Sequence, residues 1–488
     1  MSRQTRRHEA RQRAKGVPDE GRVVWQPQGA DPSRGGPAID YATWALVTIV
    51  VGAWVVGRVD PAAASLFSAI YIVSGLLLGL VSPMAGGVLV IALIPYQGAS
   101  EAIPFGTAEF MRATPIWGGV ARLLWDRWGP RRDVRANGGA QNPPTLLVVA
   151  ALAAILLAPL QRLTATALGT FTAANQNVDM LGILGTQSLL YGAWIYASHL
   201  RREQVTTLLK ALAASLTLAM VVAILAWQEF TPVSLFAFDG RVFGRLASLG
   251  YPTPTAMGVA IALPLAAGAL WSWSRRAAVA LFAFGALIII LTESRGPLLA
   301  LGAAIALLLI SVRGVKVRTA LALGAVSIAA LVALVVNRYG SDINQLLKGR
   351  LPNIESDVDR ITSWVAGVQT ALQYPLTGGG WFSVRFWNEG QLGANNVNLS
   401  HNLILQGLAD GGFPLGAAIA TVVIGSVVLM IRNRRYIPLP WRMAVVTLLV
   451  CGLWDMPQLR AFGALLGGIS LGLVARAAPS REPGSPQD

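Results

Sequence analysis

Residues 402–431 read NLILQGLADGGFPLGAAIATVVIGSVVLMI. This apolar run is long enough to cross a membrane as one helix, since about 20 mostly apolar residues span the hydrocarbon core. The segment RNRR, Arg432–Arg435, follows it directly. Because Lys and Arg gather in the cytoplasmic loops of membrane proteins, we expect the helix to end on the cytoplasmic side.

The composition extends this interpretation to the whole chain. Of 488 residues, 54% are hydrophobic and 13% are charged, whereas soluble domains carry about 25% charged residues. No long polar stretch is available to form a separate soluble core. The sequence therefore predicts an all-α polytopic membrane protein. Its net charge of +15 fits basic cytoplasmic loops, and we expect no nucleic-acid partner.

Twelve more apolar runs are expected to form spans. They are Tyr41–Gly57, Ala63–Val81, Met84–Gly98, Thr145–Leu160, Met180–His199, Val205–Trp227, Thr253–Trp273, Ala277–Leu291, Pro297–Val312, Arg318–Asn337, Trp441–Met456 and Ala461–Ala475. With thirteen spans and a cytoplasmic N-terminal tail, the short basic connections would all fall on the outer side, against the positive-inside tendency. A further crossing at Pro104–Trp125, which is weakly apolar, places them all in the cytoplasm. We therefore expect about 12–14 transmembrane helices; the alternative is a re-entrant or interfacial segment there.

The chain then divides into three parts. Residues 1–40 are basic and rich in Pro and Gly, which predicts a disordered cytoplasmic tail that binds anionic lipids or only sets the topology. Residues 41–476 form the membrane domain, with a large extracytoplasmic loop at residues 338–401. Residues 477–488 form a second cytoplasmic tail. Cys451 is the one cysteine, so an internal disulfide is excluded.

Arginines in the predicted outer segments run against the positive-inside tendency and so call for another role. Arg295 lies in a tight turn, TESRGP, where it either binds an anion or pairs with Glu293 to fix a helix hairpin. Arg241 and Arg245 precede a span of small residues. Guanidinium groups bind phosphate oxygens through paired hydrogen bonds, but these two arginines could equally be interface anchors.

The long outer loop is expected to contain an amphipathic helix capped by Ser356 or Asp357. One face of it, expected to lie on the membrane domain, carries Arg360, Trp364, Val368 and Leu372. Pro375 would end the helix, and Gly378–Gly380 would allow a sharp turn. Arg360 is either a ligand of an anionic substrate or a surface residue of a lid.

His401 is expected at the start of the following helix, with Ser400 as its N-cap. The positive end of the helix dipole favours the neutral imidazole, as a general base requires. A structural capping histidine is the alternative.

We find no HExxH motif and no Cys/His cluster on this side, so no metal site is predicted. Asp455 is an intramembrane charge that either pairs with Arg460 or orients His401.

The order of these features resembles that of the O-antigen ligase and polymerase superfamily of bacterial membrane glycosyltransferases. Members carry a Gly-Arg segment before a small-residue span, an S-R-G turn, an outer loop with Arg and Trp four residues apart, and a closing His-Asn. The matching residues are Gly244-Arg245, Ser294-Arg295-Gly296, Arg360, Trp364, Pro375, Gly378–Gly380, His401, Asn402 and Asp410–Phe413.

The resemblance implies a fold like that of the GT-C class, in the bacterial plasma membrane with the active site on the extracytoplasmic side. It implies a glycan donor on an undecaprenyl-pyrophosphate carrier, a lipid or glycan acceptor, polysaccharide-assembly partners and no cofactor. His401 and Arg295 would be catalytic, with Arg245, Arg360 and Arg241 binding the pyrophosphate and with Trp364 and Asn402 in support. Ligase and polymerase activity both stay open, and a polysaccharide or lipid transporter is the alternative from another class.

Overall fold

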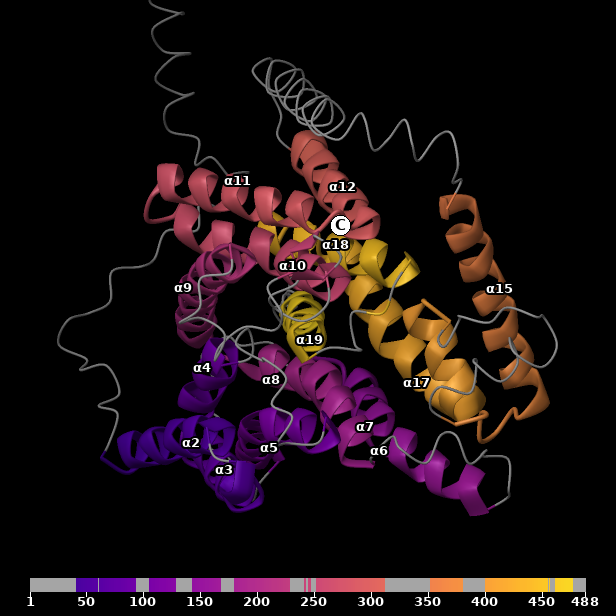
Figure 1. Ribbon diagram of the computed structural model, residues 1–488, viewed down its shortest axis with the longest axis horizontal. Helices are drawn as coiled ribbons and strands as arrows, with labels where there is room; N and C mark the ends of the chain where they lie inside the picture. The colour runs from indigo at the N-terminus through magenta and orange to yellow at the C-terminus, as the bar shows by residue number, and fades with distance from the viewer. Residues whose placement is uncertain are drawn as a thin grey trace, which may run out of the picture. The chain divides into compact units, whose positions relative to one another are not determined.

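The computed structural model describes residues 41–59, 61–93, 105–128, 143–167, 180–228, 241–242, 245–246, 252–311, 352–380, 400–454, 456 and 461–476. The chain divides into two units, Met1–Ala38 and Ile39–Asp488, and every described residue belongs to the second. That unit consists of packed helices with one small two-stranded sheet (Figure 1). The predicted all-α polytopic membrane fold is confirmed. The two tails and the predicted span Arg318–Asn337 lie outside the described residues.

Every predicted span within the described residues coincides with helix. The first half contains α2 (Tyr41–Val59), η1 (Pro61–Ala63), α3 (Ala64–Val81), α4 (Pro83–Leu93), α5 (Phe105–Trp128), α6 (Thr145–Ala167), α7 (Met180–Gln187), the π-helical turn η3 (Ser188–Gly192), α8 (Ala193–His199) and α9 (Arg202–Trp227). The second half contains β1 (Arg241–Val242), β2 (Arg245–Leu246), α10 (Pro252–Trp271), α11 (Arg275–Leu291), α12 (Arg295–Ser311), α15 (Pro352–Gln373), α17 (Leu403–Arg432), α18 (Leu439–Trp454) and α19 (Ala461–Arg476).

Length and hydropathy identify four described helices able to cross a membrane alone: α3, α9, α10 and α17. Six shorter apolar helices accompany them, within α2, α4, α6, α12, α18 and α19. A hydrophobic helix shorter than the bilayer thickness can still lie in a membrane, because the bilayer thins locally around it or its flanking side chains extend to the interface. The chain is thus a membrane protein, while the count of fourteen crossings stays a prediction.

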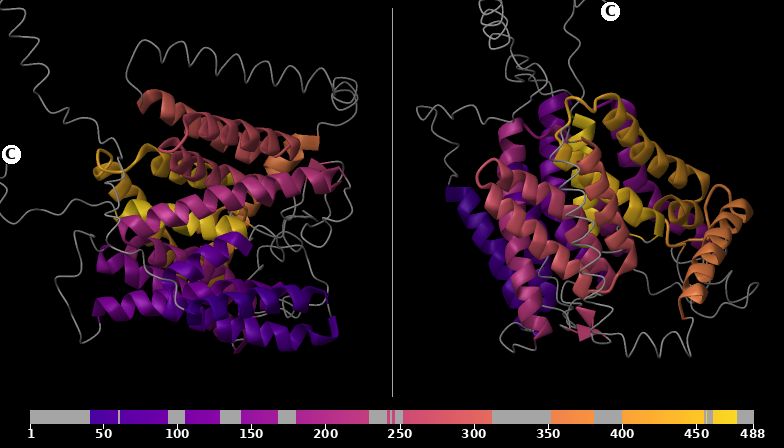
Figure 2. Two further views of the ribbon diagram at one scale, coloured as in Figure 1. Left: turned by 90° about the vertical axis from the view of Figure 1, so that its left-hand side faces the viewer. Right: turned by 90° about the horizontal axis from the view of Figure 1, so that it is seen from above.

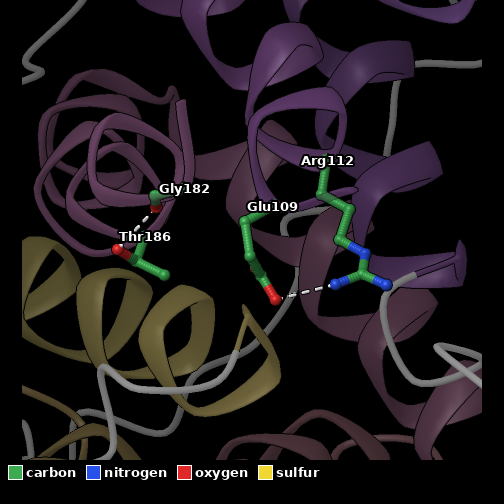
Figure 3. Close-up of polar contacts among 4 residues, drawn as sticks. All are labelled: Glu109, Arg112, Gly182 and Thr186. Atoms are coloured by element: carbon green, nitrogen blue, oxygen red, sulfur yellow. Dashed lines mark hydrogen bonds and ion pairs between the residues drawn. The ribbon is translucent and has the colours of Figure 1, made fainter. Parts of the chain in front are cut away.

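The weakly apolar segment Pro104–Trp125 folds as α5, which packs against α3, α4 and α7. Its polar residues are partly explained by an ion pair inside the bundle: Arg112 Nη1 lies 2.8 Å from Glu109 Oε1, and Glu109 is only 1% exposed (Figure 3). On α7, Thr186 Oγ1 likewise donates to the carbonyl of Gly182, at 2.9 Å (Figure 3). Polar groups with partners in their own helix can be buried at modest cost.

Glycines bring α3 and α5 into backbone contact. A Cβ atom on Gly79 would lie 2.2 Å from the carbonyl oxygen of Pro115 and 2.6 Å from the backbone nitrogen of Gly119. Small residues allow such close approach between helices in membranes, where packing supplies the driving force.

Gly79→Val should therefore separate α3 from α5 and lower the free energy of unfolding by about 1–3 kcal/mol or more. Gly52→Val in α2 is the matched control, because no atom lies within 4 Å of a Cβ atom there. Thermal unfolding in detergent measures both variants. Equal stability of the two would contradict the close packing of α3 on α5.

Contacts between helix ends agree with the predicted alternation of the spans. Tyr196 Oη in the last turns of α8 donates to the carbonyl of Pro83 at the start of α4, at 2.8 Å. Both positions are predicted near the cytoplasmic side. Gly268, near the end of α10, approaches Pro440 at the start of α18, and these too are predicted to share a side.

The most buried helix is α19, in which Ala461–Ala475 are all buried. It lies in the middle of the bundle beside α8, α10, α17 and α18 (Figure 1). Glycines again set the distance: a Cβ on Gly468 would lie 2.0 Å from the carbonyl oxygen of Leu190. Nearby, the indole nitrogen of Trp194 donates to Ser426 Oγ at 2.9 Å, which ties α8 to α17.

Candidate functional site

The S-R-G turn joins α11 to α12. Arg295 is the first residue of α12 and Pro297 the third, so the predicted turn between two spans is confirmed. Glu293 has a φ of 54°, a conformation uncommon outside glycine. Glu293 and Arg295 are both exposed, and no ion pair found among the described residues joins them. The hairpin pair considered from the sequence therefore has no support here.

Ser294 connects this turn to the start of α10. Its Oγ lies 3.4 Å from Thr253 Oγ1 and donates to it. Thr253 is the second residue of α10, in the small-residue segment that follows Arg245. Two segments that the sequence places on the outer side are thus in direct contact.

Arg241 and Arg245 lie on the two strands of the sheet. The strands are antiparallel, with Val242 opposite Arg245 and Arg241 opposite Leu246. Leu246 is fully buried, and β2 packs against α9 and α11. The helix α11 leads directly into the S-R-G turn, so β2 and Arg295 are linked through one helix. The two arginine side chains lie outside what the structure describes.

The loop helix α15 differs from its prediction in two ways. It begins at Pro352, so Ser356 and Asp357 lie within it and neither is its cap. The face predicted to lie on the membrane domain is also wrong, since Val368 and Leu372 are exposed. The buried face is formed by Ser363, Ala366, Gly367, Thr370 and Ala371.

These small residues let α15 lie against α17, as Figure 2 shows in its right-hand view. A Cβ atom on Gly367 would be 3.2 Å from Ser400 Cβ, next to His401. Trp364 is half-buried, one turn before Gly367. Residues 352–361 are described as helix without their side chains, so the position of the Arg360 guanidinium is outside the described part of the chain.

Ala366→Leu should push α15 away from α17, because Ala366 is fully buried. Overpacking of this kind costs about 1–3 kcal/mol. Val368→Leu adds similar bulk on the exposed side and should change stability by less than about 0.5 kcal/mol. Limited proteolysis measures the cleavage rate within α15, which we expect to be higher in Ala366→Leu than in Val368→Leu. Equal cleavage rates within α15 would mean that the buried face has been misassigned.

The start of α17 also corrects the sequence prediction. Asn402, not Ser400, is the N-cap: its Oδ1 accepts from the backbone N–H groups of Ile404 and Leu405, at 3.0 and 3.1 Å. His401 precedes the cap and lies outside the helix. Its φ of 47° is left-handed, and its side chain is partly buried. His401 still lies within two residues of the helix N-terminus.

Two glycine turns, Gly378–Gly380 after α15 and Gly411–Gly412 within α17, are hydrogen-bonded to each other. The helix α17 is interrupted at Gly411 and Gly412, and Gly412 has φ 65° and ψ −165°. Gly379 N–H donates to the carbonyl of Ala409 at 2.8 Å, and Gly380 N–H to that of Asp410 at 3.2 Å. In return, Phe413 N–H donates to the carbonyl of Pro375 at 2.8 Å. The carbonyl groups released by the kink are thereby satisfied, as buried backbone requires.

The motif elements meet around the end of α18. Leu403 lies beside Gly452, with 3.8 Å between the Leu403 Cβ and the Cβ position of the glycine. The adjacent Cys451 packs in one cluster with Met257 of α10 and Ala300 of α12. Arg295 is the first residue of α12, and His401 lies two residues before α17. Both helices contact α18 near its C-terminal end. Convergence of the four side chains on one cavity stays a prediction, and Asp455 and Arg460 lie outside the described residues.

Residues 280–420 match the family model described as O-antigen ligase, Wzy_C. This part of the chain is similar to the O-antigen ligase family. The resemblance inferred from the motifs is thereby confirmed, since Arg295, Arg360, Trp364, His401 and Asn402 all lie within the matched residues. A search of curated proteins finds no match to the chain.

The matched region extends from α11 to the middle of α17, so Arg241 and Arg245 lie before it. In the part of the chain that the structure describes, no group of three or more His, Cys, Asp or Glu side chains is suited to hold a metal ion. Among the described residues, the charged side chains at these turns are those of Glu293 and Arg295, which are exposed, and of Asp410, which is buried.

Proposed function

We propose that the protein is a glycosyltransferase that moves a glycan from an undecaprenyl-pyrophosphate carrier to an acceptor hydroxyl at the outer face of the bacterial plasma membrane. One observation carries this proposal. The O-antigen ligase match includes both the S-R-G turn and the His-Asn pair, and the helices that bear them pack on the same end of α18. From the N-terminal half, α6 packs against α17.

The reaction follows from the residue types. The acceptor oxygen attacks the anomeric carbon of the donor, and the bond from that carbon to the pyrophosphate oxygen breaks. His401 accepts the acceptor proton as general base. Arg295, with Arg245, Arg360 and Arg241, stabilises the negative charge that develops on the departing polyprenyl pyrophosphate. Arginine suits this role because it stays protonated throughout and binds phosphate oxygens with a planar pair of donors.

Asn402 and Trp364 support the site in this proposal. Asn402 fixes the start of α17 through its two cap hydrogen bonds. Trp364 lies on α15 one turn from the glycine that touches Ser400. The arginines supply the charge needed at the leaving group, so the proposed mechanism uses neither a metal ion nor a cofactor.

The proposal is tested by deleting the protein in its native cell and analysing the surface glycans. We expect loss of all polymer attached to the acceptor, with polymer retained on the polyprenyl carrier. Single repeat units left on the acceptor would instead identify a polymerase of the same superfamily. Unchanged glycans with impaired movement of a lipid-linked substrate would contradict glycosyl transfer and favour a transporter.

A further inference from the structure

The backbone at His401 needs an external restraint. Its φ of 47° is sparsely populated for residues other than glycine, and such conformations persist where the surroundings over-determine them. The residue that follows, Asn402, is fixed by its cap hydrogen bonds. The restraint on the preceding residue, Ser400, comes from further along α17.

Gln406 provides that restraint. Its Oε1 accepts from the backbone N–H of Ser400 at 2.8 Å and from Ser400 Oγ at 3.0 Å. Both residues are almost completely buried, at 0% exposure for Ser400 and 2% for Gln406. Since Oε1 accepts from two donors on Ser400, the amide nitrogen of Gln406 points away from Ser400, toward the next turn of α17.

Asp410 receives that amide nitrogen. Gln406 Nε2 donates to Asp410 Oδ1 at 2.7 Å, one helical turn further along. Asp410 is 5% exposed, and a buried carboxylate in a membrane domain is costly unless it serves a purpose. The backbone of Asp410 is itself anchored, because its carbonyl accepts from Gly380 N–H in the turn that follows α15. A continuous set of hydrogen bonds therefore runs from the outer loop to the residue beside His401.

We propose that Gln406 and Asp410 are positioning residues that hold His401 in its left-handed conformation, with the imidazole placed to accept the acceptor proton. This inference rests on the proposed function. Asp410 fixes the orientation of the Gln406 amide, Gln406 fixes Ser400, and Ser400 with Asn402 fixes the backbone of His401. Neither Gln406 nor Asp410 contacts substrate in this account.

The test is a transfer assay with the purified full-length protein in proteoliposomes, using a polyprenyl-pyrophosphate-linked glycan and its acceptor. Gln406→Met keeps the volume and removes all three side-chain hydrogen bonds of Gln406, two from Ser400 and one to Asp410. We expect kcat to fall about 100-fold, as for a displaced catalytic group, with KM for the donor within about threefold, because donor binding does not depend on the base.

A paired exchange tests the hydrogen bonds themselves. In Gln406→Glu combined with Asp410→Asn, the asparagine amide donates to the glutamate, whose oxygens still accept from Ser400. We expect this double variant to recover kcat to within about tenfold of wild type. Thermal unfolding of Gln406→Met in detergent shows separately whether its loss of kcat is a failure to fold. An unchanged kcat in Gln406→Met, or no recovery in the double variant, overturns the inference.

The same assay separates this inference from the proposed function. Wild-type protein that transfers no glycan counts against the proposed function. Wild-type transfer that is lost in His401→Asn but kept in Gln406→Met supports the function and rejects the positioning role alone.

Discussion

Replacement of His401 by alanine is expected to lower glycan transfer by about 100- to 10,000-fold, the contribution of a general base. The protein should still insert in the membrane, because His401 precedes α17 and is only partly buried. His401→Asn is the more informative variant. Asparagine tolerates the left-handed backbone found here, so its effect reports on the imidazole and not on a change in the loop.

The matched control is His199→Asn. His199 lies at the end of α8, where its Nδ1 shares a hydrogen bond with the carbonyl of Ile195 at 2.7 Å. It is predicted at the opposite side of the membrane from His401, so transfer should be unaffected. Activity of His401→Asn within threefold of wild type, measured at equal amounts of inserted protein, would exclude His401 as the base.

The second large effect is expected from Gly412→Ala. With φ 65° and ψ −165°, Gly412 has a backbone conformation that only glycine adopts readily, which costs another residue about 1–3 kcal/mol. A Cβ atom would also lie 2.5 Å from the carbonyl oxygen of Pro375 and 2.9 Å from the nitrogen of Gly378. The docking of the two glycine turns should therefore fail, with loss of both stability and transfer.

Gly302→Ala in α12 is the control for this variant, because no atom lies within 4 Å of a Cβ atom there. Alanine in a helix interior is favoured over glycine by up to about 1 kcal/mol, so Gly302→Ala should be at least as stable as wild type. Thermal unfolding in detergent and the transfer assay compare the two. A Gly412→Ala protein with wild-type stability and activity would mean that the turns are not docked as described.

The helices were predictable from the sequence because apolar length is a strong signal, whereas their buried faces were not. In water, apolar residues of an amphipathic helix mark the side that packs. In a membrane protein lipid is as apolar as the core, so that side is marked by small residues instead. This is why Val368 and Leu372 were assigned to the wrong face of α15, and why Ala366 and Gly367 were overlooked.

The turns that carry the proposed site residues can be placed from the sequence, whereas the geometry around them cannot, and the roles of those residues stay predictions. The S-R-G turn and the His-Asn pair were located correctly, since turns and spans bracket them. The helix cap was assigned to Ser400 because Ser and Asn are comparable N-caps, and only the hydrogen bonds distinguish them. Gln406 and Asp410 carried no signal of a role beside His401, because their spacing of four residues is also typical of an ordinary pair on a helix.

The docking of one glycine turn on the other was equally hidden. Each turn was visible separately, at Gly378–Gly380 and at Asp410–Phe413. Their contact depends on backbone hydrogen bonds between segments about 30 residues apart, and backbone groups are the same in every sequence. In the sequence, the only signal of such a close backbone approach is the presence of glycine.

The central claim is that this bundle breaks the bond between a glycan and its pyrophosphate carrier and passes the glycan to a hydroxyl. The most direct measurement is product analysis after incubation of the reconstituted protein with a polyprenyl-pyrophosphate-linked glycan and an acceptor. We predict that free polyprenyl pyrophosphate is released in equal amount to the glycan transferred, and that Arg295→Ala lowers both by about 100- to 1,000-fold. Transfer of a glycan that still carries phosphate, or release that is unchanged in Arg295→Ala, would contradict the account.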